Sequence, residues 1–145
     1  MKKLEVVAYT DGSAKGNPGP GGWGVVLKYG EHTKELAGGV ELSTNNQMEL
    51  RAVEEALAAV KRPVELVVHT DSALVVGWLT GAIRRRQPAI REACARIERL
   101  AAEKGVTLKL VKVPGHAGDP LNERAHALAS QAAEAVKRSQ ATVAA

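Results

Sequence analysis

The stretch that decides the fold, residues 4–29, reads LEVVAYTDGSAKGNPGPGGWGVVLKY. It contains two runs rich in β-forming residues, at 4–10 and 23–29. The glycines and prolines at 16–22 predict a loop between these two strands. Because a third β-rich run follows at 33–42, we expect the first three strands to form an antiparallel meander.

After this meander the apolar spacing changes from strand-like to helical. Residues 44–47 match the spacing of a helix capping box. Apolar side chains then recur at intervals of three and four, on one face of a helix ending near Pro63, at Leu50, Val53, Leu57 and Val60. The later segments alternate, with strands predicted at 64–70 and 106–113 and helices at 72–80, at 88–103 and from 121 to about 138.

The resulting element order, β-β-β-α-β-α-α-β-α, is typical of an α/β fold. Since the later strands alternate with helices, we expect the strands at 4–10, 64–70 and 106–113 to be parallel. No linker or internal repeat divides the chain. We therefore predict a single domain over residues 1–138 and a flexible C-terminal tail at 139–145.

The composition limits the classes of protein to which the chain can belong. Its 145 residues suffice for one domain with a real core, and 45% hydrophobic with 25% charged residues is typical of a globular protein. The single cysteine, Cys94, has no disulfide partner, and no segment resembles a signal peptide or a membrane span. We expect a cytoplasmic monomer without membrane contact. The net charge of +4 suits a polyanionic partner but does not identify one.

Three acidic residues lie where packing alone would not place them. Asp11 and Asp71 each end a predicted strand, and Glu49, in the first turn of the predicted helix, flanks its apolar face. Each has an ordinary explanation, because turns, helix dipoles and helix caps all favour acidic residues. Together they predict a site for a hard cation such as Mg²⁺. Two such ions about 4 Å apart can activate a water and stabilise the leaving oxygen of a phosphodiester.

Several motifs carry a family resemblance. They are Tyr9-Thr10-Asp11-Gly12-Ser13 with Gly16-Asn17-Pro18-Gly19-Pro20-Gly21-Gly22-Trp23-Gly24, then Thr44-Asn45-Asn46-Gln47-Met48-Glu49-Leu50, Thr70-Asp71-Ser72, and Gly115-His116-Ala117-Gly118 with Asn122-Glu123-Arg124. In order and spacing these motifs resemble type 1 ribonuclease H over about residues 4–135. The first two motifs together are the most specific.

The resemblance implies a ribonuclease H-like fold, a five-stranded mixed sheet flanked by helices, and an endonuclease that hydrolyses the RNA strand of RNA–DNA hybrids. It implies two Mg²⁺ ions per site, with Mn²⁺ as a substitute, held by Asp11, Glu49 and Asp71, and products with 5′-phosphate and 3′-hydroxyl ends. It also makes His116 a mobile-loop histidine that assists proton transfer or product release. The residues that match hybrid contacts in the family are Gly12, Asn17, Thr44, Asn45 and Asn46, of which the last three also suit a helix cap.

The sequence departs from the family where a fourth carboxylate is usual, on the last helix, because His126 stands there. One interpretation is that His126 binds or orients the second metal ion. Another is that Glu123, on the same helix face, takes over part of that role, and a third leaves the position without a role. Because imidazole suits transition metals better than Mg²⁺, the exchange predicts weaker Mg²⁺ binding and favours Mn²⁺.

A second departure lies between Trp78 and Ile90, where many bacterial relatives carry a long basic helix and loop that grips the DNA strand. Here the segment is short, and Arg84, Arg85 and Arg86 are predicted to supply a reduced substitute through phosphate contacts. A merely solvated basic turn is the alternative interpretation.

Two other functions fit part of the pattern. A DNA-processing relative of the same superfamily shares the fold and the acidic residues, but the glycine-rich and Thr-Asn-Asn motifs argue against it. A hybrid-binding module with weakened catalysis is suggested by His126, whereas the three carboxylates and His116 argue for an active enzyme. Cleavage of hybrid, compared with duplex DNA and duplex RNA, distinguishes these functions.

Overall fold

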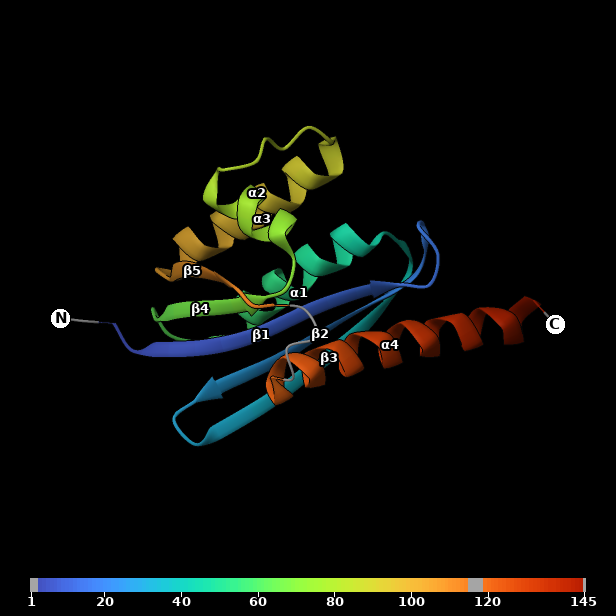
Figure 1. Cartoon of the computed structure of the whole chain (residues 1–145), viewed down its shortest axis with the longest axis horizontal. Coiled ribbons are helices and arrows are strands. Elements are labelled where there is room, and N and C mark those ends of the chain that lie inside the picture. Colours follow the sequence, from blue (N-terminus) through green and yellow to red (C-terminus); the bar gives the residue numbers. More distant parts are fainter. Residues whose placement is uncertain (1–2, 115–118, 145) are drawn as a thin grey trace.

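The computed structural model describes residues 3–114 and 119–144 and places helices on both faces of one sheet (Figure 1). In chain order the elements are β1 (Glu5–Ala14), β2 (Gly19–Tyr29), β3 (His32–Ser43), α1 (Asn45–Ala59), β4 (Glu65–Thr70), α2 (Ala73–Thr80), α3 (Pro88–Lys104), β5 (Thr107–Lys112) and α4 (Pro120–Ala144). None of the helices in the described part of the chain is long and apolar enough to cross a membrane.

The sheet has the strand order β3-β2-β1-β4-β5. β2 pairs antiparallel with β1 and β3, whereas β4 pairs parallel with β1 and β5, which confirms the predicted mixed sheet. In the register, Tyr9 lies beside His69 on adjacent parallel strands. The two aspartates that follow along these strands, Asp11 and Asp71, are therefore brought to the same region of the sheet.

The helices cover the two faces of the sheet unequally. Figure 1 shows α1, α2 and α3 on one side and α4 alone on the other. The predicted apolar face of α1 is buried, with Leu50, Val53 and Leu57 fully inaccessible in the main core. α4 packs on β1, β2 and β3.

The glycine-rich stretch is mostly strand, so the prediction of a loop over 16–22 is wrong from Gly19 onward. The reason is the close approach of α4 to β2. A Cβ on Gly22 would lie 2.2 Å from the carbonyl oxygen of Ala129, and one on Gly24 would lie 2.4 Å from that of Ala125. Both alanines are fully buried. These glycines therefore let a helix backbone contact a strand, rather than forming a turn.

α4 runs to Ala144, beyond the predicted end near Arg138, so the tail expected from residue 139 is helical through 144. Two contacts accompany this extension. The Gln140 Nε2 donates to the Glu41 carbonyl oxygen of β3 at 2.7 Å, and the Thr142 hydroxyl donates to the Arg138 carbonyl oxygen at 3.0 Å. Nothing in the sequence of the last residues marks a helix stop before this point, because glycine and proline are absent there.

Candidate active site

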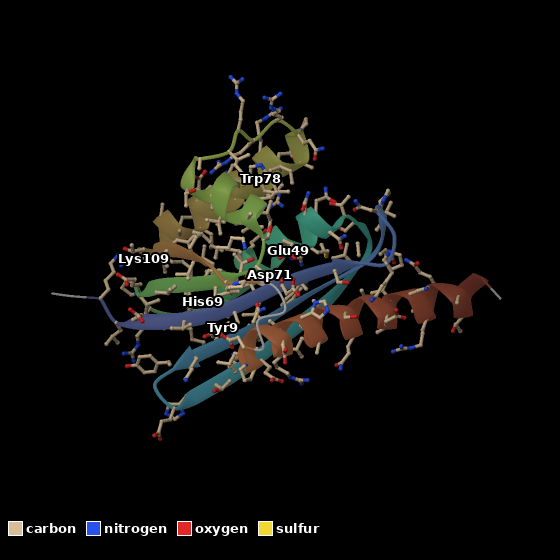
Figure 2. All side chains as sticks on the ribbon, in the orientation of Figure 1. Tyr9, Glu49, His69, Asp71, Trp78 and Lys109 are labelled. Atoms are coloured by element: carbon tan, nitrogen blue, oxygen red, sulfur yellow. The ribbon has the colours of Figure 1, made fainter. Side chains whose placement is uncertain are left out.

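Three carboxylates from three different elements converge at the centre of the molecule. Asp11 lies on β1, Glu49 on α1, and Asp71 directly follows β4. One oxygen from each lies within 4.8 Å of the others. Figure 2 shows Glu49 and Asp71 side by side between the helical layer and the sheet. The structure therefore brings together the three acidic residues that the sequence singled out.

The local geometry of this cluster depends on a glycine and a helix cap. A Cβ on Gly12 would lie 2.2 Å from the backbone nitrogen of Glu49, so only glycine lets β1 pass this close to α1. The Thr44 hydroxyl accepts from the Gln47 backbone N–H, and the Gln47 side chain accepts from the Thr44 N–H, both at 3.2 Å. This capping box fixes the start of α1. Glu49 is the fifth residue of the helix, just past the first turn in which it was predicted.

The described residues place too little positive charge beside the three carboxylates to balance their negative charge. Oε2 of Glu49 is buried and has no hydrogen-bond partner there. Burial, followed by the charges of Asp11 and Asp71, raises the pKa of Glu49 well above its ordinary value. Burial and then the charge of Asp11 also raise the pKa of Asp71, while a hydrogen bond from its own backbone N–H and then the charges of His126 and Lys112 partly offset this. A cluster of oxygen donors with an orphaned buried oxygen fits a hard divalent cation.

The start of α4 forms the other wall of the site. A cavity of about 230 Å³ is lined by the three carboxylates and Gly12 together with Asn122, Glu123 and His126. Nδ1 of His126 lies 2.7 Å from Oδ2 of Asp11, although the imidazole is largely exposed. The other Asp11 oxygen, Oδ1, accepts from the Gly12 backbone N–H at 2.9 Å. His126 thus contacts one carboxylate of the cluster, and Glu123 faces the same cavity.

The predicted hybrid-binding residues Asn17, in the loop after β1, and Asn45, at the start of α1, are linked to one another. The Asn17 side-chain oxygen accepts from the Asn45 backbone N–H at 3.3 Å, and the Asn45 side-chain oxygen accepts from the Ala14 backbone N–H at 2.7 Å. Both asparagines are exposed. Because their oxygens are used internally, their amide N–H groups are the parts available to a ligand. Asn46, beside them, is half-buried.

The three predicted arginines between α2 and α3 do not behave alike. Arg85 donates to the Trp78 carbonyl oxygen at 2.9 and 3.0 Å, and its two terminal nitrogens contact the two Glu98 oxygens at 2.8 and 2.9 Å. Its side chain is therefore engaged within the protein. Arg84 and Arg86 are exposed, on either side of it. Within residues 3–114 and 119–144 neither takes part in an ion pair, so a ligand can reach both.

Two residues of the site were not predicted. Lys112, the last residue of β5, pairs in register with Thr70 and acts electrostatically on Asp71. Asn122 is buried and lines the cavity four residues before His126, on the same helix face. The spacing along α4 is the signal that points to Asn122. The predicted catalytic residue His116 lies outside the described residues.

Comparison with known proteins bears directly on this site. The sequence profile of the RNase H family matches residues 3–134. The ribonuclease H of Saccharopolyspora erythraea is 47% identical over 147 aligned positions, covering 90% of this chain and 92% of that protein. The ribonuclease H of Halorhodospira halophila is 48% identical over 137 positions, covering 87% and 91%.

Solved structures give the same likeness in three dimensions. RNase H1 from the halophilic archaeon Halobacterium salinarum superposes with a TM-score of 0.79 at 34% identity, over 90% of this chain and 98% of that one. LC11-RNase H1, solved in complex with an RNA/DNA hybrid, gives a TM-score of 0.78 at 31% identity, over 89% and 96%.

Proposed function

The chain belongs to the ribonuclease H family, and from that premise we propose that it is a metal-dependent endonuclease that hydrolyses the RNA strand of RNA–DNA hybrids. The convergence of Asp11, Glu49 and Asp71 is the observation that carries this proposal. A hybrid-bound relative of the same fold supports the choice of substrate. The products are expected to carry 5′-phosphate and 3′-hydroxyl ends.

The carboxylates of Asp11, Glu49 and Asp71 would hold the divalent ions. When bound, such ions supply an activated water and stabilise the leaving oxygen of the phosphodiester. Mg²⁺ fits the oxygen donors of this cluster. The neighbouring imidazole favours Mn²⁺ as an alternative or preferred ion.

We assign His126 the role of orienting Asp11. The 2.7 Å contact between Nδ1 and the Asp11 carboxylate fixes one of the two Asp11 oxygens, and the Gly12 N–H fixes the other. Glu123, which lines the same cavity, supplies a further oxygen donor. His116 stays the predicted proton-transfer or product-release residue.

The hybrid is proposed to lie across the carboxylates, between the asparagines and the arginine segment. The amide N–H groups of Asn17 and Asn45 donate to sugar or phosphate oxygens, which suits a protein that distinguishes RNA by its 2′-hydroxyl. Arg84 and Arg86 neutralise DNA-strand phosphates. Arg85 is removed from this predicted set because its donors are held by Trp78 and Glu98.

One assay tests the function. Labelled RNA–DNA hybrid, duplex DNA and duplex RNA are incubated with Mg²⁺, with Mn²⁺ and with EDTA, and an Asp71→Asn variant serves as the matched control. Cleavage of the RNA strand of the hybrid alone, abolished by EDTA and by Asp71→Asn, is expected. Binding without cleavage would favour a hybrid-binding module, and cleavage of duplex DNA would favour a DNA-processing enzyme. A cytoplasmic location and a monomeric state stay predictions.

A further inference from the structure

A polar stripe on α4 contacts β1 and the loop that follows it. His126, Ser130 and Glu134 lie four residues apart, on one face of the helix. His126 contacts Asp11, as described above. The Lys15 ammonium donates to the Ser130 hydroxyl at 2.9 Å and lies 3.6 Å from a Glu134 carboxylate oxygen. One helix face is therefore bonded both to a candidate metal ligand and to the loop.

Lys15 stands at the base of the loop that carries Asn17. Its backbone N–H donates to the Pro20 carbonyl oxygen at 2.8 Å, which closes the loop. A Cβ on Gly19 would lie 2.4 Å from the Lys15 carbonyl oxygen, so the two loop ends are in tight contact. At the other side of the loop, the side chain of Asn17 is held by the start of α1. The loop is thus held to α4 by the side chain of Lys15 and to α1 by the side chain of Asn17.

We propose that Lys15 is a positioning residue for hybrid binding, because its ammonium fastens the Asn17 loop to Ser130 and Glu134 of α4. This inference rests on the proposed function. On this proposal the Lys15 ammonium binds side chains of the protein and does not bind a phosphate of the hybrid. Only about a quarter of the Lys15 side chain is exposed, 26%, which fits an internal contact.

A direct phosphate contact by Lys15 makes opposite predictions. If Lys15 neutralised a phosphate, Glu134 would compete for it, and Glu134→Gln would strengthen hybrid binding. Removing a negative charge also strengthens binding of a polyanion in general. If Lys15 positions the loop, Glu134→Gln weakens binding in spite of the lost negative charge. Whether Glu134→Gln strengthens or weakens hybrid binding therefore distinguishes a phosphate-binding Lys15 from a loop-positioning one.

The experiment measures kcat and KM for hybrid cleavage at several salt concentrations. Lys15→Met is expected to raise KM about three- to tenfold with kcat nearly unchanged, since it removes one hydrogen bond and one partly exposed ion pair. The slope of log KM against log salt should stay parental. Lys15→Arg should restore most of the affinity, and Glu134→Gln should raise KM about twofold. The charge-matched controls are Lys137→Met for the lysine and Glu103→Gln for the glutamate, and both should have nearly parental KM.

Several outcomes would overturn the inference. A salt slope that is shallower by about one unit in Lys15→Met would show a lost phosphate contact. A lower KM in Glu134→Gln, or a parental KM in Lys15→Met, would also reject it while leaving the cleavage function intact. A parent protein that does not cleave hybrid would reject both proposals. Mn²⁺-dependent thermal stabilisation equal to that of the parent is expected in every variant, because the carboxylates are untouched.

Discussion

His126 and Asp11 lie 115 residues apart in the sequence, yet their side chains meet at 2.7 Å, Nδ1 to Oδ2. This contact joins the first turns of α4 to the middle of β1 at the carboxylate cluster. It lies where the resemblance to the family implies a fourth carboxylate, on the last helix. The contact therefore replaces repulsion between two anions by an attractive or neutral pair.

Replacing His126 by aspartate is expected to shift the metal preference toward Mg²⁺. The aspartate adds an oxygen donor beside Asp11, and Mg²⁺ prefers oxygen, whereas imidazole suits Mn²⁺. The Mg²⁺ concentration for half-maximal hybrid cleavage should fall about tenfold, a size typical for changes around metal ligands. Parallel titrations with Mg²⁺ and Mn²⁺ measure this.

The matched control for this exchange is His32→Asp, which makes the same change at an exposed site on β3. It should leave the ratio of Mg²⁺ to Mn²⁺ activity at the parental value. Without metal, His126→Asp should melt at a lower temperature than the control, because a further anion then faces Asp11. An unchanged metal preference in His126→Asp would reject the assignment of His126 to this site.

Glu49→Gln should stabilise the metal-free protein and abolish cleavage. The pKa of Glu49 is raised by burial and by the charges of Asp11 and Asp71. A carboxyl whose pKa is raised on folding keeps its proton longer in the folded chain, so stability is lost as pH rises above the unfolded carboxyl pKa. Glutamine removes this loss, and we expect a gain on the order of 1–3 kcal/mol at neutral pH.

Thermal melts in EDTA between acidic and neutral pH test this prediction. The parent should lose stability with rising pH more steeply than Glu49→Gln does. Glu103→Gln, an exposed change on α3, should follow the parent. Equal pH slopes in parent and Glu49→Gln would contradict the electrostatic account, even if cleavage is lost.

The sequence predicts those parts of the fold and site that depend on local patterns. The α1 face with Leu50, Val53 and Leu57 follows from helical spacing, and it is buried. Asp11 and Asp71 could be singled out because both were predicted at the ends of strands. Those two strands were expected to be parallel in one sheet, where such residues gather at the same edge. The cluster was thus accessible from order and spacing alone.

The rest could not be predicted because it depends on contacts between distant elements. The glycines of β2 look like a loop until α4 is placed against them. Arg85 looks like a free cation until Glu98, on α3, is seen beside it. Lys15 likewise finds its partners more than a hundred residues away, at Ser130 and Glu134. Side-chain pairing across the fold leaves no periodic trace in the sequence.

Mutations in the arginine segment should have two different effects, on hybrid binding at Arg84 and Arg86 and on stability at Arg85. Arg84→Ala and Arg86→Ala together are expected to raise KM and to flatten the salt dependence by up to about two units, one per lost phosphate contact. Their thermal stability should stay close to the parental value, because both are exposed. Cleavage kinetics between low and moderate salt measure this.

Arg85→Ala is the contrasting variant. It should lower the free energy of unfolding by about 1 kcal/mol, since the Trp78 carbonyl and partly exposed Glu98 lose their partner. Its effect on the salt slope should be smaller than that of either neighbour. A salt slope flattened equally by all three substitutions would return Arg85 to the hybrid-binding set.

Gly24→Ala tests whether the contact between β2 and α4 holds the active site together. The added Cβ would lie 2.4 Å from the Ala125 carbonyl oxygen, so α4 must shift away from the sheet. Such overpacking is expected to cost about 3 kcal/mol of unfolding free energy. Because Gly24 pairs with Asp11 and Ala125 precedes His126, the shift should also lengthen the His126–Asp11 contact. Loss of Mn²⁺-dependent activity should therefore exceed the loss of folded protein.

Gly30→Asn, at a turn with open space around it, is the control and should be nearly neutral in both measurements. A parental free energy of unfolding in Gly24→Ala would contradict the close contact between α4 and β2.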